Sequence, residues 1–331
     1  KKKVRLAVKK VRQKHKREII KKDIRRQMTE RYRKEERIMD DVLIGSHINM
    51  CSPNYFEETA LKAIEYGENT FMFYTGAPQN SIRVPLDKCH IEEGKKLLLK
   101  NKINLNKIVV HAPYIVNLAN IDAKKHEFSV NLLINELKRT EAFGANILVL
   151  HPGATLGLDY NESLNALVSG LDEAIEKANN NVKIALETMS GKGSEIGKNF
   201  DELASIINKS RFGDRLGVCF DTCHVNDSGY DLSNINFILD EFDKKIGLKK
   251  LLVIHLNDSK NPINSHKDRH ENIGFGTIGF DVLLQYVYEP KLISIPKILE
   301  TPFINGFAPY KSEIKMIRSK KFNPLLKEEF F

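Results

Sequence analysis

The segment Leu216–His224 reads L-G-V-C-F-D-T-C-H, an apolar run typical of a buried strand that ends in an acid and a histidine. Charged groups at the end of a buried strand are unfavourable unless that end faces something polar. A carboxylate oxygen and an imidazole nitrogen are both ligands for borderline divalent cations such as Zn²⁺. The pair Asp221 and His224 therefore suggests a metal site, although ordinary loop residues can also produce such an ending.

The same kind of ending recurs along the chain, where apolar runs stop at His, Asp or Glu. Five histidines and four carboxylates exceed the three or four ligands of one tetrahedral zinc ion. They favour a cluster of two or three metals, bridged by a carboxylate such as Glu187. Nitrogen and oxygen ligands without thiolate favour Zn²⁺, with Mn²⁺ or Fe²⁺ as possible substitutes. The candidate ligands are His111, His151, Glu187, Asp221, His224, His255, Asp268, His270 and Glu300.

Such a cluster predicts a class of reaction. Closely spaced divalent ions lower the pKa of a shared water from about 16 towards about 7, and they bind the attacking and leaving oxygens of a phosphodiester. We find no Ser–His–Asp signature, and the acidic strand end beside Cys219 and Cys223 disfavours a nucleophilic thiolate. The four cysteines form no paired C-x-x-C arrangement, so we expect reduced thiols in an intracellular compartment.

From Val42 onwards, short runs rich in Val, Ile and Leu alternate with helical segments, as in a parallel sheet buried on both faces. The alternation predicts a (β/α)₈ TIM barrel, in which chemistry gathers at the carboxyl ends of the strands. A doubly wound open sheet is the alternative, but no Gly-rich phosphate loop follows the first strand. The predicted strands are Val42–Asn49, Asn69–Thr75, Lys107–Tyr114, Asn146–Pro152, Val182–Thr188, Leu216–Cys223, Leu251–Asp258 and Pro296–Pro302. The predicted helices are Tyr55–Tyr66, Glu92–Lys100, Glu127–Phe143, Leu164–Ala178, Asp201–Asn208, Ile235–Lys245, Phe280–Tyr288 and Lys311–Ser319.

The net charge of +9 comes from one end of the chain: residues 1–40 hold 18 Lys and Arg against 6 acidic residues. We expect two parts, a flexible or helical basic N-terminal extension over 1–41 and a barrel over 42–325. The extension is either a solvated tail or a tether to polyanions, which would act through phosphates rather than sequence. A targeting role is a further possibility, although the chain starts without Met and has no apolar core of a secretory signal. No apolar run approaches the roughly 20 residues of a membrane span, so no membrane partner is expected.

The motif set, taken together, resembles the endonuclease IV family of apurinic/apyrimidinic (AP) endonucleases, which are TIM barrels built around three zinc ions. The resemblance runs from Val42 to Phe322, with the motifs in order. It rests on Gly45-Ser46-His47, His111-Ala112-Pro113-Tyr114, Leu150-His151-Pro152-Gly153, Leu186-Glu187-Thr188, Phe220-Asp221-Thr222-Cys223-His224, His255-Leu256-Asn257-Asp258, Asp268-Arg269-His270 and Leu299-Glu300-Thr301.

The resemblance implies three zinc ions per chain and a base-excision repair reaction. A hydroxide bridging the first two ions would attack the phosphorus 5′ to an abasic site in duplex DNA, leaving 3′-hydroxyl and 5′-deoxyribose phosphate ends. Trimming of blocked 3′ ends is also implied. Glu187 and Glu300 are the expected catalytic residues, and His47 is expected beside the ligands without being one. The implied ligand sets are His111, His151 and Glu187; Glu187, Asp221, His255 and Glu300; and His224, Asp268 and His270.

The resemblance also implies where DNA is contacted. Tyr114 and Ile115 fall where the family inserts side chains into the base stack, and such residues can wedge between bases. The alternative is that Tyr114 only covers the rim of the barrel. Gln79 is the nearest counterpart of an arginine with which some members enter the minor groove, and Arg83 follows it. Lys192 and Lys198 are candidate phosphate contacts.

Two other functions compete with this interpretation. Sugar isomerases and epimerases of the xylose-isomerase-like barrels share the fold and rim metals, but they need fewer ligands. A DNA-binding protein that has lost catalysis would not keep every expected ligand. We therefore expect a monomeric AP endonuclease that acts on DNA inside the cell, in the cytoplasm or nucleoid of a bacterium, or in the nucleus or a DNA-containing organelle of a eukaryote.

Overall fold

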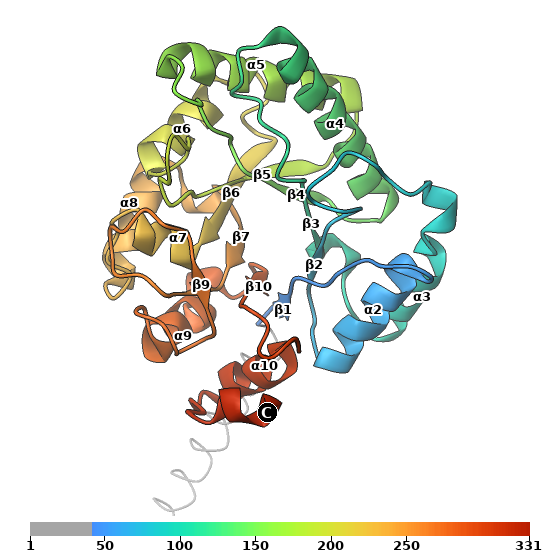
Figure 1. The fold of residues 1–331 in the computed structure, drawn as a ribbon, viewed down its shortest axis with the longest axis vertical. Coiled ribbons are helices and arrows are strands. Elements are labelled where there is room, and N and C mark those ends of the chain that lie inside the picture. The colour runs from blue at the N-terminus through green and yellow to red at the C-terminus, as the bar shows by residue number, and fades with distance from the viewer. Residues whose placement is uncertain (1–41) are drawn as a thin grey trace, which may run out of the picture. The chain divides into compact units, whose positions relative to one another are not determined.

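Eight parallel strands form a ring at the centre of the molecule, with helices around it, as the view down the ring in Figure 1 shows. The strands pair in the order β1-β10-β7-β6-β5-β4-β3-β2, and a parallel bridge between His47 and Met72 joins the two ends. The expected TIM barrel is confirmed. The strands are β1 (Ile44–Ser46), β2 (Met72–Phe73), β3 (Val109–His111), β4 (Ile147–Leu150), β5 (Lys183–Glu187), β6 (Leu216–Asp221), β7 (Leu251–His255) and β10 (Lys297–Leu299).

This computed structural model describes residues 42–331, and the expectations for the basic extension lie outside the described residues. Most helices lie within a few residues of their predicted bounds. Helices α4 and α5 each begin four residues earlier than predicted, because Asp122 and Asp159 cap them by accepting the backbone N–H groups of Lys125 and Glu162. The helices of the outer ring are α2 (Tyr55–Tyr66), α3 (Ile91–Lys100), α4 (Ala123–Ala142), α5 (Tyr160–Ala178), α6 (Phe200–Lys209), α8 (Ile235–Lys245), α9 (Phe280–Tyr288) and α10 (Tyr310–Ser319).

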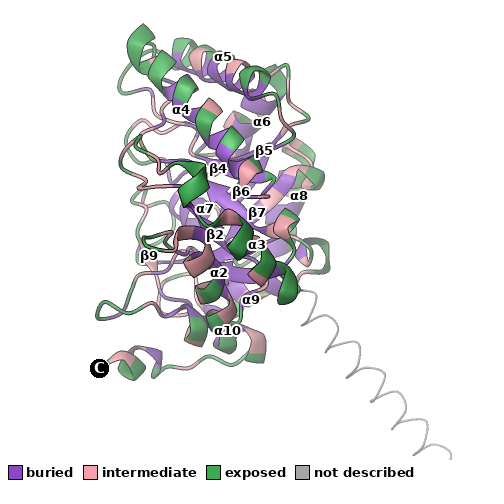
Figure 2. Cartoon of the chain, turned by 90° about the vertical axis from the view of Figure 1, so that its right-hand side faces the viewer, coloured by how far each residue is buried: buried purple, intermediate pink, exposed green. Residues whose placement is uncertain are grey.

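The strands bury side chains on both faces, which explains why their sequences are continuous apolar runs. Figure 2 shows the buried residues along the strands and the exposed ones on the outer helices. The interior of the barrel is filled by apolar side chains from successive strands. Only the carboxyl ends of the strands are left for polar chemistry. The interior cluster consists of Met72, Val109, Ile147, Val149, Ala185, Cys219, Val253 and Ile298.

The prediction of a strand through Cys223 is wrong. Strand β6 stops at Asp221, and the short helix α7 (Thr222–Asp227) begins at the next residue. The Asp221 carboxylate accepts the backbone N–H of His224 at 2.8 Å, so it caps this helix. An aspartate at a strand end can therefore start a helix, and His224 extends from the first turn of that helix.

The prediction of a strand from Leu251 to Asp258 also needs correction. Strand β7 ends at His255, and β8 (Asp258–Ser259) pairs antiparallel with β9 (His270–Glu271) outside the barrel. This pairing places His270 at the rim of the barrel, after the loop formed by residues 260–269. No helix within residues 42–331 is long and apolar enough to cross a membrane.

Candidate metal centre

The carboxylate of Glu187 lies at the centre of a group of histidines from four different strand ends. Its Oε2 is 3.1 Å from Nε2 of both His111 and His151. Its Oε1 is 3.0 Å from Nδ1 of His255 and 3.4 Å from Nδ1 of His224. The side chain of Glu187 is 1% exposed. A buried carboxylate surrounded by imidazole nitrogens on both oxygens is arranged to bridge cations.

A second group contains Asp221, His255 and Glu300 together with Glu187. Nδ1 of His255 is 3.0 Å from Glu300 Oε2 and 3.8 Å from Asp221 Oδ2. Asn257 orients both acids, because its side-chain amide donates to Asp221 Oδ2 at 2.7 Å and its side-chain oxygen accepts the backbone N–H of Glu300 at 2.8 Å. Sequence analysis did not identify this role of Asn257, which lies two residues after a predicted ligand.

The third group joins helix α7 to the 260–270 loop. His224 Nε2 is 3.0 Å from Asp268 Oδ1, and His270 Nε2 is 3.6 Å from the same oxygen. The other ring nitrogen of His224 is 2.8 Å from the backbone carbonyl of Thr188, which fixes the orientation of the ring. The structure thus brings every predicted ligand to one rim of the barrel, in three sets, the first two of which share Glu187.

These residues fit divalent cations. In each set, one ligand atom per residue lies within 4.8 Å of the others. The buried Nε2 atoms of His255 and His270 have no hydrogen-bond partner, although buried polar atoms normally have one. The side chains line a cavity of about 330 Å³ that is open at the rim. The unpartnered Nε2 of His270 lies 3.6 Å from Asp221 Oδ2 and from Asp268 Oδ1, and imidazole nitrogens beside carboxylate oxygens are a donor set that zinc prefers.

The charges of the site depend on one another. Burial opposes ionisation of Glu187, but His255 and His151 outweigh it and hold the pKa of the Glu187 carboxyl well below its usual range. Burial also opposes protonation of His224, yet Asp221 and Asp268 raise the pKa of its imidazole well above the usual value. Without a cation, Glu187 is therefore ionised and the imidazole of His224 carries a proton.

The cysteines beside the site do not provide thiolates. Burial raises the pKa of Cys219 to about 12, and the carboxylates of Glu187 and Asp221 act in the same direction, although the imidazole of His255 opposes the shift. Burial and the neighbouring Asp221 raise the pKa of Cys223 even further. Cys219 lies on strand β6 and Cys223 on helix α7, next to Asp221 and His224, and these positions bring both sulfurs within ligand distance.

His47 lies at the rim next to the ligands but belongs to none of the three sets. Its ring meets Tyr74 edge-on at 4.9 Å between centroids. Burial lowers the pKa of His47 to about 4, so its ring is neutral at physiological pH. Tyr74, which sequence analysis missed, lines the cavity and packs 5.0 Å from the His111 ring. In the sequence, only the position of Tyr74 directly after strand β2 indicated that it could lie at the rim.

The rim loops after β2 and β3 hold the predicted DNA contacts. Tyr114 is 56% exposed and Ile115 is half-buried. The backbone N–H of Tyr114 donates to the carbonyl of Pro78 at 3.0 Å, which ties the two loops together. The ring of Tyr114 lies nearly parallel to that of His151, with centroids 6.1 Å apart. Tyr114 therefore both covers a predicted ligand and faces solvent.

Gln79 is exposed on the first of these loops, whereas Arg83 is not available to enter DNA. The Arg83 side chain is 5% exposed and pairs with Glu136 at 2.6 Å. It also donates to the backbone carbonyls of Asn80 and Ile82, so it holds the loop from within. Ile82, on the same loop, is 79% exposed.

Comparison with known proteins places this geometry in a family. Residues 60–320 match the family model described as xylose isomerase-like TIM barrel. A curated relative from Mesoplasma florum, named "Probable endonuclease 4", is 48% identical over 294 residues, which cover 87% of this chain and 100% of the relative. The chain belongs to the endonuclease IV family. A family member from Oceanobacillus iheyensis, with the same name, is 49% identical over 295 residues, covering 87% of this chain and 98% of the relative.

Among solved structures, endonuclease IV from Thermus thermophilus matches with a TM-score of 0.73 and 26% sequence identity. The match covers 84% of this chain and 98% of the Thermus chain. The family resemblance drawn from the motifs is therefore confirmed.

Proposed function

We propose that this protein is a zinc-dependent AP endonuclease that hydrolyses the phosphodiester 5′ to an abasic site in duplex DNA. The products are a 3′-hydroxyl and a 5′-deoxyribose phosphate. The observation that carries the proposal is the buried Glu187 carboxylate, whose two oxygens lie within 3.4 Å of nitrogens from four histidines. Membership in a family whose relatives are named endonuclease 4 supports the same conclusion.

The side chains of the site would hold three zinc ions in the three sets described above. When bound, closely spaced divalent ions activate a water molecule and neutralise the charge on a phosphodiester. Glu187 would bridge two ions, Glu300 would complete the second set, and Asn257 would fix the direction of Asp221 and Glu300. His224 would be held by Thr188 in the orientation that presents Nε2 to the third ion.

The surface beside the metal centre suits DNA. Lys192, Lys267 and Arg269 line a hollow of about 690 Å³ that also includes the proposed ligand Asp268. Cations at this place would bind backbone phosphates next to the reacting one. Because a 3′ end blocked by a phosphate-linked sugar fragment presents a phosphodiester of the same chemistry, we extend the proposal to 3′-end trimming. We further propose that the protein acts as a monomer on DNA inside the cell.

Removing the ring of Tyr114 should weaken binding of damaged DNA. We expect Tyr114→Ala to lower the affinity for an abasic duplex by about tenfold, since an aromatic contact to a base contributes about 1–3 kcal/mol. Tyr114→Phe keeps the ring and should bind like the wild type. Fluorescence anisotropy with abasic and intact duplexes measures both. Equal affinity of the alanine variant and the wild type for the abasic duplex would mean that Tyr114 only covers the rim.

A direct assay separates the proposal from the sugar isomerase alternative. The zinc-loaded protein should nick a duplex that carries one abasic analogue and leave the undamaged duplex intact. It should not interconvert ketoses and aldoses. Turnover of a sugar without nicking would reject the proposal in favour of an isomerase or epimerase.

A further inference from the structure

Asp227 is a buried carboxylate outside the three proposed ligand sets. It is the last residue of helix α7, which also carries His224, and it is fully buried. A carboxylate in such a place must be satisfied by hydrogen bonds. Three of its four partners lie on the 259–268 segment, which leads to Asp268 and His270, and the fourth is the neighbouring Asn226.

The Asp227 carboxylate binds this segment at three points. Its Oδ2 accepts the backbone N–H of Asp268 at 3.0 Å and the side-chain amide of Asn261 at 3.1 Å. Its Oδ1 accepts the hydroxyl of Ser259 at 2.7 Å and the side-chain amide of Asn226 at 3.1 Å. Three of these four hydrogen bonds therefore hold the 259–268 segment, and the fourth is made with the neighbouring Asn226.

The backbone of helix α7 continues the same contact. The carbonyl of Asp227 accepts the N–H of His266 at 2.9 Å, and the carbonyl of Asn226 accepts the N–H of Asn264 at 3.1 Å. The loop therefore follows the end of helix α7 over several residues.

The loop needs this support because its backbone is unusual. Asn264, His266 and Asp268 have φ angles of 64°, 53° and 54°, in the left-handed region that side chains with a Cβ rarely adopt. Such conformations persist only where surrounding contacts determine them. Each of these three residues is held in place by a bond from helix α7.

We propose that Asp227 is the positioning residue of the third metal site. Helix α7 would provide one ligand directly, His224, and would place Asp268 through the carboxylate of Asp227. The 3.0 Å distance between His224 Nε2 and Asp268 Oδ1 is the result of this arrangement. The inference rests on the proposed function, because the third site is one of the three zinc sites proposed above.

The test compares Asp227→Ala with the wild type after dialysis against graded concentrations of a zinc chelator. We expect Asp227→Ala to retain two ions as the wild type does and to lose the third at lower chelator concentrations. The affinity for that third ion should fall about 10–100-fold, as it does when other residues that orient metal ligands are replaced. Asp227→Asn has the same shape but presents an amide to donors, so it should fold and show a smaller loss in the same direction.

A second readout needs no metal. In the zinc-free protein, hydrogen exchange of the amides in 261–268 should be at least about tenfold faster in Asp227→Ala than in the wild type, because their anchor is gone. This measurement judges the positioning role even if the wild type binds fewer than three ions, an outcome that would reject only the trinuclear site.

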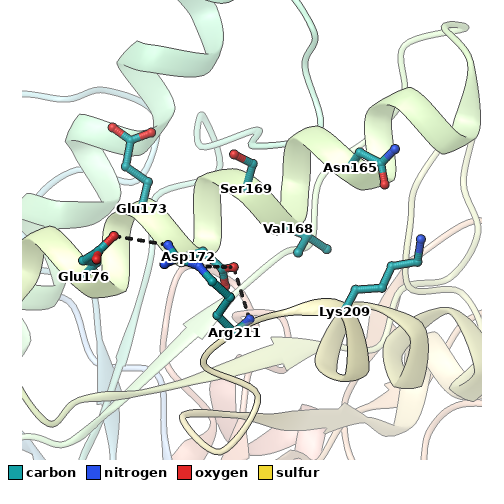
Figure 3. A pocket seen from close by; sticks show the side chains of 8 residues that line it. All are labelled: Asn165, Val168, Ser169, Asp172, Glu173, Glu176, Lys209 and Arg211. Carbon is teal, nitrogen blue, oxygen red and sulfur yellow. Dashed lines mark hydrogen bonds and ion pairs between the residues drawn. The ribbon is translucent and has the colours of Figure 1, made fainter.

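Asp172 offers a matched control, shown in Figure 3 with the groove between α5 and α6. It is also a buried carboxylate, and it anchors a loop by accepting the Ser210 hydroxyl and the backbone N–H of Arg211. Asp172→Ala should lose thermal stability but retain three ions and wild-type exchange in 261–268. The proposal would be overturned if Asp227→Ala retained zinc and exchanged the amides of 261–268 as the wild type does. It would also be overturned if Asp172→Ala lost the third ion and exchanged these amides as fast as Asp227→Ala.

Discussion

Replacing Glu187 by Gln should abolish nicking at an abasic site while DNA binding remains. We expect kcat to fall by at least about 10³-fold, because the bridging charge would contribute several kcal/mol and each 1.4 kcal/mol is a factor of ten. The glutamine amide places an NH₂ group at one of the two oxygen positions, which face either His111 and His151 or His255. In the proposed function, DNA binding would depend mainly on contacts to phosphates outside this cavity, so we expect the affinity to change less than about threefold. Single-turnover cleavage and anisotropy on the same abasic duplex measure the two quantities separately.

Glu68→Gln is the matched control for this experiment. Glu68 is buried like Glu187, but burial raises the pKa of its carboxyl well above the usual range, whereas that of Glu187 is held well below it. It bonds to the Ser46 hydroxyl and belongs to none of the proposed ligand sets. The control should nick at the wild-type rate. If Glu187→Gln also nicked at the wild-type rate, Glu187 could not bridge the ions of the reaction.

Removing the metal should have an effect as large as removing Glu187. We expect the purified protein to hold about three ions per chain, mostly zinc, and chelation to lower nicking by at least about 10³-fold, because water activation would be lost. Readdition of Zn²⁺ should restore activity, while Mg²⁺ should not, since imidazole ligands suit zinc. Elemental analysis of the protein before and after chelation gives the ion count. A single ion per chain, or full activity in the presence of chelator, would contradict the trinuclear site.

The zinc-free protein should also show a defined pH dependence. His224 and His255 have pKa values raised well above the usual 6.5, so both carry a proton at neutral pH when no cation is bound. Zinc must displace these protons, and its apparent affinity should therefore rise with pH. Calorimetry in buffers of different ionisation enthalpy should show proton release at pH 7. Binding without proton release would mean that these two imidazoles are not ligands.

The sequence predicted the barrel, and it predicted which His, Asp and Glu side chains gather at the rim, because both depend on local patterns. Apolar runs that end in His, Asp or Glu mark the carboxyl ends of buried parallel strands, where residues distant in the sequence converge. The bounds of helix α8, Ile235–Lys245, agree with the prediction because an Asn cap and an amphipathic pattern define them. The ligand sets needed the family resemblance as well, since spacing alone did not divide the ligands among three ions.

The remaining features depend on contacts between distant segments. Arg83 is a candidate DNA contact by sequence, but its partner Glu136 lies on helix α4 and turns the side chain inward. Asp221 ends a strand and caps a helix at the same time, which a pattern of apolar residues cannot distinguish from a longer strand. The role of Asp227 depends on a loop that begins more than 30 residues later in the sequence.

The position and chemistry of the cut test the proposed function most directly. A duplex with one abasic analogue, labelled at either end, should be incised once by the zinc-loaded protein, on the 5′ side of the lesion. The upstream fragment should carry a 3′-hydroxyl that a DNA polymerase extends without further treatment, and the downstream fragment should carry the 5′-deoxyribose phosphate. Cleavage on the 3′ side, an upstream fragment that cannot be extended, or an intact duplex would contradict a metal-dependent AP endonuclease.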